Sequence, residues 1–237
     1  MLSSLRQPTV ALSLLLLAAC ATQPVASVAK LERTTPTRGV PILLMPIDLE
    51  LSEFTAGGVN EPRADWTRTA DELVGPALQK HLDARSVRLV GYPRGSDGIA
   101  ALTPEDRQID KLHAAVGMTI LQHAFNEMNK LPTKGDRLDW TLGNSTRSLQ
   151  QRFNADYALF VFVRDSYATA GRVAVILVGA VLGVGIQGGS QIGFASLVDL
   201  RTGDIVWFNR LARGTGDLRT AAAAQETVEQ LLANFPQ

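Results

Sequence analysis

The side chains best suited to chemistry are few, because the chain of 237 residues has one cysteine and three histidines. Imidazoles bind metal ions and transfer protons near neutral pH. His113 and His123 fall in one predicted helix and would lie about 15 Å apart along its axis, too far apart to share a metal ion. His81 lies at the edge of an apolar helical stripe, as expected of a surface or partly buried histidine. The sequence therefore predicts no metal site.

Other catalytic patterns are incomplete. Residues 188–193 contain a serine but lack the G-x-S-x-G spacing of a nucleophile elbow. Residues 183–188 match G-x-G-x-x-G, but a strand-like segment follows instead of the helix that a dinucleotide site needs, so no nucleotide cofactor is predicted. Asp199 and Asp204 flank one turn and are interpreted as turn and strand-end residues, not as an acid/base pair. We expect no catalytic residues and no enzyme; a hydrolase with residues far apart in the chain is an alternative.

The cysteine stands out because of the residues before it. A short N-terminal segment carries Arg6, residues 10–17 form an apolar run interrupted only by Ser13, and Leu17, Ala18 and Ala19 lead into Cys20. A positive segment, an apolar run and small residues at a cut site are the three parts of a secretory signal. Cleavage after Ala21 would also fit the A-x-A pattern and would discard the cysteine.

Residues 17–20 resemble the lipobox of bacterial lipoprotein precursors, which has the form Leu-Ala/Ser-Gly/Ala-Cys. The resemblance implies cleavage before Cys20 and acylation of its sulfur and new amino group, a covalent lipid being the only cofactor expected. A lone exported cysteine fits this interpretation because it has no disulfide partner. Three acyl chains exceed the two signals needed for stable anchoring. Ala21 in place of Asp after the cysteine implies the periplasmic face of the outer membrane in a Gram-negative host.

Composition divides the chain into three parts. We expect a signal peptide at 1–19, a lipidated tether rich in Thr, Pro, Ser, Ala and Gln at 20–39, and one periplasmic α/β domain at 40–237. Lys plus Arg and Asp plus Glu both number 23, so no global positive field favours nucleic acid. The hydrophobic content of 46% is enough for a core without metal or disulfide staples.

Residue patterns predict an α/β domain of the α+β type, with helices packed on a single mixed sheet and a C-terminal β-hairpin followed by a closing helix. The strand at 157–163 is apolar on both faces and should be central. Gly75-Pro76 should kink or divide its helix. Residues 57–62 read as a loop. The predicted strands are 40–51, 87–92, 157–163, 191–200 and 205–211, and the predicted helices are 65–82 capped by Asp65, 103–130 capped by Thr103, 144–153, and 220–235 capped by Thr220.

Two segments of the last third carry a wider resemblance. Residues 154–159 (NADYAL) and 197–207 (LVDLRTGDIVW) are similar to an "A-D-Y-x-L" strand and a "V-D-L-x-T-G-x-I-V-W" hairpin. These patterns occur in the periplasmic α/β domains of curli secretion-channel lipoproteins, of lipoprotein activators of penicillin-binding proteins, and of the N-terminal domain of TolB. The resemblance implies a partner-binding or assembly domain and supplies no catalytic residue.

An apolar run punctuated by glycines, 171–186, departs from that pattern. It is short of the roughly 20 residues that a helix needs to cross a bilayer. One interpretation is a buried strand or helix hairpin within the domain. The other is an exposed element that contacts membrane or a second subunit, because large exposed apolar patches mark interfaces. The candidate interface residues are Val173, Val175, Leu177, Val181 and Leu182.

Together these features predict a lipid-anchored binding or assembly lipoprotein of the cell envelope. Its expected partners are the membrane, through the lipid, and an envelope protein or a second copy of the chain. Nucleic acid is not expected as a partner. An oligomeric channel-forming or secretion-accessory lipoprotein that uses 171–186 is an alternative function.

Overall fold

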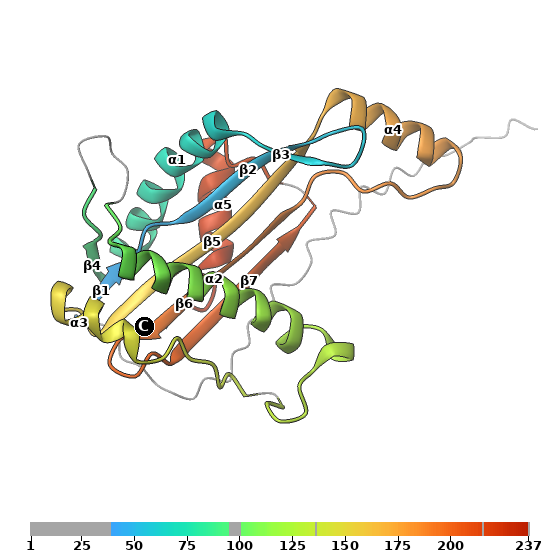
Figure 1. Cartoon of the computed structure of the whole chain (residues 1–237). Coiled ribbons are helices and arrows are strands. Elements are labelled where there is room, and N and C mark those ends of the chain that lie inside the picture. The colour runs from blue at the N-terminus through green and yellow to red at the C-terminus, as the bar shows by residue number, and fades with distance from the viewer. Residues whose placement is uncertain (1–38, 95–100, 136, 215, 237) are drawn as a thin grey trace, which may run out of the picture.

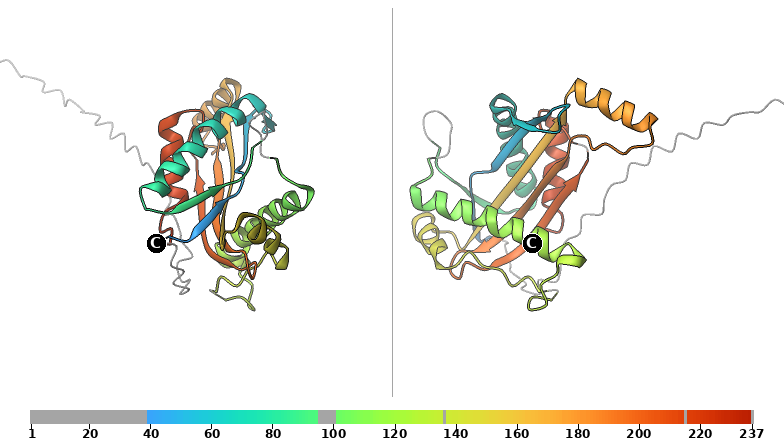
Figure 2. Two further views of the ribbon diagram at one scale, coloured as in Figure 1. Left: turned by 90° about the vertical axis from the view of Figure 1, so that its left-hand side faces the viewer. Right: turned by 45° about the vertical axis from the view of Figure 1, so that its right-hand side comes forward.

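The computed structural model describes residues 39–94, 101–135, 137–214 and 216–236. These residues build three layers around one seven-stranded mixed sheet. Helices α1 (Ala64–Asp83) and α5 (Ala221–Leu231) cover one face, and α2 (Pro104–Ala124) crosses the other, as Figure 1 and the left view of Figure 2 show. The predicted fold class, a mixed sheet closed by a β-hairpin and a final helix, is confirmed.

Strand β5 (Tyr157–Ala168) is the centre of the sheet. On one edge it pairs in parallel with β1 (Pro41–Leu44) and then with β2 (Asp48–Phe54). On the other edge it pairs antiparallel with β6 (Gln191–Asp199). The outer strands are β7 (Ile205–Arg213) beside β6, β4 (Arg88–Gly91) beside β1 and β3 (Asn60–Pro62) beside β2.

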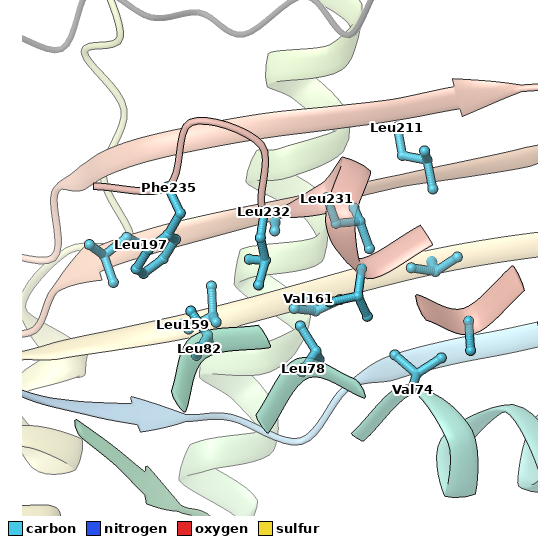
Figure 3. Packing of buried hydrophobic residues seen from close by; sticks show 14 of the residues in the cluster. Val74, Leu78, Leu82, Leu159, Val161, Leu197, Leu211, Leu231, Leu232 and Phe235 are labelled. Carbon is cyan, nitrogen blue, oxygen red and sulfur yellow. The ribbon is translucent and has the colours of Figure 1, made fainter. Parts of the chain in front are cut away.

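Strand β5 is apolar on both faces because each face lies in a separate core. Leu159 and Val161 point to the side of α1 and α5, where Figure 3 shows them packed with Leu78 and Leu82 of α1. The alternate residues of β5 point to the other side, into the core beneath α2. These are Ala158, Phe160 and Phe162. Alternation of side chains along a strand explains how one strand serves both cores.

Two strand predictions need correction. The strand expected at 40–51 is two strands, β1 and β2, because Pro46 lacks the N–H that a continuous ladder would need. Both halves nevertheless pair with β5, one after the other along the same edge. Residues Asn60–Pro62, expected to be a loop, form the short strand β3.

Helix predictions were right in position and less accurate at the ends. Thr103 and Thr220 cap α2 and α5 as expected, by accepting hydrogen bonds from Asp106 N and Ala223 N. Arg63, not Asp65, occupies the N-cap of α1, and its guanidinium pairs with the Asp65 carboxylate. The helix is not divided at Pro76.

The connection after α2 is less helical than predicted. Helix α2 ends at Ala124 and not near 130, and a short 3-10 helix, η1 (Glu127–Asn129), follows. The short helix expected at 144–153 begins as a 3-10 turn, η2 (Asn144–Thr146), and continues as α3 (Arg147–Phe153).

Close contact between α2 and the sheet depends on Gly117. A Cβ atom at this position would lie 2.1 Å from Cε2 of Phe194 on β6, far inside van der Waals contact. Phe194 is fully buried and stacks on Phe162 and Phe208. The ring therefore has no free space into which to move, and glycine sets the distance between helix and sheet.

We expect Gly117→Ala to destabilise the domain by about 1–3 kcal/mol, because the added methyl group overpacks this contact. The higher helix propensity of alanine would offset only part of that cost. Urea unfolding measures the change. Gln122→Ala, at an exposed position of the same helix, is the control and should stay within about 0.5 kcal/mol of the natural protein. Equal stabilities for the two variants would contradict the close packing.

Candidate interaction site

The connection between β5 and β6 is a hairpin made of one helix and a non-helical return segment. Helix α4 (Ala170–Val181) starts directly after β5, and the chain returns as an extended segment to Gln191, where β6 begins. Figure 1 shows α4 projecting away from the three layers at the end of the sheet. We call residues 169–190 the α4 hairpin.

The base of the α4 hairpin is tied to the sheet. Thr169 N donates to Phe54 O at 3.0 Å, and its hydroxyl accepts from Arg172 N and so caps the helix. The Arg172 guanidinium donates through Nε and Nη2 to Gln187 O, at 2.9 and 2.7 Å, and lies 4.3 Å from the centre of the Phe54 ring. Gly189 passes so close to Ser166 O that a Cβ atom would lie 2.0 Å from it. These contacts fix where the hairpin leaves the domain.

The tip of the hairpin folds back on the helix. Gly183 has a φ of 72°, a left-handed conformation that favours glycine, and Val184 N donates to Gly179 O at 2.8 Å. Ile186 then packs on Gly179, where a Cβ atom would lie 2.5 Å from Ile186 Cδ1. The hairpin therefore has an ordered turn of its own although it stands outside both cores.

Most apolar side chains of the hairpin face solvent. Leu177 is 63% exposed and Val181 86% exposed, and within α4 only Gly179 is buried. The interpretation of 171–186 as a buried element is therefore wrong. The five predicted interface residues are all exposed, and the pattern missed two further exposed valines. The exposed large apolar residues are Val173, Val175, Leu177, Val178, Val181, Leu182 and Val184.

The hairpin surface includes a groove and carries almost no charge. The groove, of about 460 Å³, lies between one side of α4 and the returning Val184 and Ile186, and its lining is entirely apolar. Between Asp165 and Asp199 the sequence has a single charged residue, Arg172 at the base. The arrangement can bind apolar groups, and it offers no group for acid/base or metal chemistry.

Aromatic and arginine side chains surround the base of the hairpin. Phe54 at the end of β2 pairs with Ala168 at the end of β5, and Tyr167 contacts Trp66 of α1 edge to face at 5.6 Å. Arg219 lies over both of these rings, 4.1 Å from Tyr167 and 4.5 Å from Trp66. All these aromatic side chains are half-buried. They form an amphipathic rim at this end of the sheet.

A histidine and a serine that are both buried, His113 and Ser196, form a pair that resembles a catalytic base and nucleophile. His113 Nε2 lies 2.7 Å from Ser196 Oγ, and burial lowers the pKa of His113 to about 3. His113 is 2% exposed, Ser196 is fully buried, and neither lines the apolar groove or the polar cavity described next. Among the described residues, no hydrogen bond joins a carboxylate to His113. The two side chains lie beneath α2, and each provides the other with a hydrogen-bond partner for its buried polar atom.

A polar cavity of about 270 Å³ lies beside the base of the hairpin and includes Asp165, Ser166, Tyr167 and Arg219 in its lining. Asp165 accepts hydrogen bonds from Tyr167 Oη and from Gln191 Nε2. Burial raises the pKa of the Asp165 carboxyl, and these hydrogen bonds oppose the shift. Ser166 Oγ donates to Ser190 O and accepts from Ser190 N. Among the described residues, no hydrogen bond joins the Ser166 hydroxyl to the Asp165 carboxylate that lines the same cavity.

The remaining predicted residues have structural roles or lie elsewhere. Asp199 accepts from the backbone and guanidinium of Arg201, which confirms its turn and strand-end role. Residues 183–188 lead into a strand and not a helix, as expected. Leu17, Ala18, Ala19 and Cys20 lie outside the described residues. No metal-binding cluster of His, Cys, Asp or Glu occurs in the described ranges, and no helix there has the length and apolarity needed to span a bilayer.

Asp110 of α2 is a buried carboxyl in a partly exposed charge cluster that the sequence patterns did not indicate. Burial, reinforced by the nearby Asp48 carboxylate, raises the pKa of Asp110 to about 6. Lys111 and Arg164 oppose that shift, and both also pair with Asp48, at 3.4 and 2.8 Å. Ion pairs in this cluster connect α2 to β2 and β2 to β5.

We expect Asp110→Asn to change how stability depends on pH. A carboxyl with a raised folded-state pKa favours folding below its unfolded-state pKa, and this contribution is lost as pH rises through about 6. Relative to the variant, the natural protein should lose on the order of 1–2 kcal/mol between about pH 4 and pH 8. Urea unfolding at both pH values measures this. Gln122→Ala, which removes no titratable group from α2, should leave the pH dependence unchanged; parallel curves for Asp110→Asn and the natural protein would contradict the assignment.

Comparison with known proteins finds no matching family model and no matching curated protein. Among solved structures, the chain is similar to a PelC dodecamer from Paraburkholderia phytofirmans, with 13% identity, coverage of 84% of this chain and 90% of that chain, and a TM-score of 0.38. It is also similar to lipoprotein GNA1162 from Neisseria meningitidis, with 16% identity, coverage of 80% and 93%, and a TM-score of 0.31.

A third similar structure is the C-terminal domain of LpoB from Salmonella enterica, with 14% identity, coverage of 76% of this chain and 85% of that chain, and a TM-score of 0.29. One of the three is a named lipoprotein and another assembles as a dodecamer. At these identities and TM-scores the likeness is too distant to transfer a function to this chain.

Proposed function

We propose that this protein is a lipid-anchored, non-catalytic binding or assembly protein of the bacterial cell envelope. Lipid on Cys20 would hold the folded domain at a membrane, and the α4 hairpin would be its contact element. The observation that carries the proposal is the exposed apolar surface of the hairpin. Contact of such a surface with water is unfavourable, and large exposed apolar patches mark interaction sites.

The chemistry of the described residues supports a role in binding. His113 and Ser196 are enclosed in the core, so a substrate has no path to them. The polar groups that line the cavity beside the hairpin are hydrogen-bonded to one another and to neighbouring residues of the domain. A hydrolase would need a nucleophile, a base and a reachable reacting atom in one place. Neither the buried pair nor the cavity meets all three needs.

Anchoring follows from the sequence before the domain. Cys20 with the residues before it fits lipidation, and Ala21 favours the periplasmic face of the outer membrane in a Gram-negative host. An oligomeric channel would need an element that crosses the membrane. Helix α4, with 12 residues, is about 18 Å long, whereas the hydrocarbon core is about 30 Å thick. We therefore favour binding at a membrane surface over formation of a channel.

We expect mass spectrometry of the protein purified from membranes to find three acyl chains on an N-terminal Cys20. Cys20→Ser should abolish acylation and reduce the membrane-bound fraction, because one apolar hairpin anchors less strongly than several acyl chains. Cell fractionation with immunoblotting measures the second effect. A free amine on Thr22 in the natural protein would contradict lipid anchoring.

A photo-cross-linking amino acid at position 177 tests the hairpin as a contact element. In intact cells, we expect adducts from position 177 because its side chain would be covered. The control is the same group at Met128, which is 91% exposed and lies on η1, and there we expect little adduct. The adduct mass distinguishes a second copy, another protein and a phospholipid. Equal yields at the two positions would contradict the role of the hairpin.

A further inference from the structure

We propose that the α4 hairpin inserts into the interfacial region of a phospholipid bilayer, so that the protein meets the membrane at two points, its lipidated cysteine and this hairpin. The inference rests on the proposed function in one respect: lipid on Cys20 keeps the domain close to a bilayer. It goes further by naming lipid as the material that covers the hairpin.

The distribution of apolar side chains around α4 favours lipid over a protein partner. Val178 and Leu182 face the groove, whereas Val173 and Leu177 lie on the other side of the helix, at 100° per residue. Both sides are exposed. A second copy packed on the groove would leave the other side in water. A helix that is apolar all round requires apolar surroundings on all sides, which a bilayer supplies.

Charge gives a second reason. From Val173 to Ile186 no side chain is polar or charged. Moving these side chains from water into lipid therefore carries no free-energy cost of burying a polar or charged group. The first polar side chains on either side are those of Arg172 and Gln187, and the Arg172 guanidinium donates to the backbone carbonyl of Gln187 at the base. The boundary between apolar and polar residues is therefore a plane across the base of the hairpin.

The rim of the domain at that plane has the composition of a membrane interface. Phe54, Trp66 and Tyr167 are half-buried at this end of the sheet and stack with Arg172 and Arg219. Tryptophan and tyrosine favour the level of the headgroups because one end of each ring is apolar and the other polar. The guanidinium of Arg172 is held by Gln187 O and that of Arg219 by the Asp217 carboxylate, and their remaining N–H groups can donate to phosphate groups at the same level. The rim would thus rest on the headgroups while the hairpin enters below them.

The backbone of the hairpin limits the depth of insertion. The return segment from Leu182 to Gly189 is not helical, so its peptide groups need water or headgroups as hydrogen-bond partners. Amphipathic elements at membrane surfaces lie about 5–10 Å into the boundary between headgroups and acyl chains. We place the hairpin at that depth and not across the bilayer.

The tether is long enough for both contacts. Gly39 leads into β1, whose Ile42 pairs with Tyr157 at the start of β5, so the tether joins the domain at the end of β5 opposite α4. Strand β5 has 12 residues and spans about 40 Å. The segment 20–38 would reach about 65 Å when extended. Cys20 and the hairpin can therefore enter the same bilayer with the sheet standing upright on it.

A fluorescent label on a new cysteine tests the insertion in the full lipidated protein. Cys20 is the only natural cysteine and its sulfur would carry lipid, so Leu177→Cys provides one free thiol for an environment-sensitive dye. The protein is reconstituted into phosphatidylcholine/phosphatidylglycerol vesicles that contain nitroxide-bearing phospholipid. Met128→Cys, labelled in the same way, is the matched control because its side chain is also highly exposed.

We expect a blue shift of the dye at 177, with quenching several-fold stronger than at 128. A nitroxide near the headgroups should quench the dye at 177 more than one near the chain ends. Val178→Glu with Val181→Glu in the labelled protein should remove the difference between 177 and 128 without changing the thermal unfolding midpoint, because both side chains face solvent in the folded domain.

Equal quenching at 177 and 128 would overturn the inference. So would a blue shift at 177 that depends on protein density and not on nitroxide lipid, because a second copy would then cover the hairpin. Mass spectrometry of Cys20 is a separate readout. Unmodified Cys20 would overturn the lipid anchor but leave the hairpin result standing, since dye on Cys20 would contribute equally to both variants and cancel in their difference.

Discussion

Strand β5 imposes the constraint on which the domain depends, because both its edges and both its faces are occupied. Parallel strands β1 and β2 take one edge and β6 takes the other. One face packs on α1 and α5, and the other lies in the core beneath α2. A strand that is paired on both edges and covered on both faces requires apolar side chains along its length, as residues 157–163 have.

The same constraint explains why the α4 hairpin is outside. The segment between β5 and β6 must leave and return at one end of the sheet, since these strands are antiparallel neighbours. At that end, β2 and β6 already flank β5, and α1 packs over one face with its Trp66 against Tyr167. Helix α4, with 12 residues, contributes no side chain to either core. The segment therefore extends beyond the end of the sheet and remains at the surface.

The domain also shows how buried polar groups support a fold without forming a site. His113 is held between aromatic rings and bonds to Ser196, and burial lowers its pKa so that the imidazole stays neutral in the core. Asp165 and Gln191 are joined in a hydrogen-bonded network near the hairpin. Buried polar atoms need partners, and partners inside the protein leave them unavailable to a substrate. The perturbed pKa values of His113 and Asp165 therefore reflect burial.

Local patterns in the sequence determined much of this protein. Capping by Thr103 and Thr220, the central apolar strand and the turn between β6 and β7 follow from interactions among residues close in the chain. The single cysteine after its apolar run led to the prediction of a lipid anchor, which lies outside the described residues.

Only the tertiary structure decided three further features. Pro46 interrupts the first strand, yet whether the chain then continues along the same edge of β5 depends on pairing with residues more than a hundred positions away. Gly117 could be recognised as a close-packing position only from Phe194 on a distant strand. The exposure of the α4 hairpin also could not be derived from its own sequence. An apolar run of this length is equally compatible with core and surface, and only the packing of the other helices on both faces of the sheet shows that this run lies outside both cores.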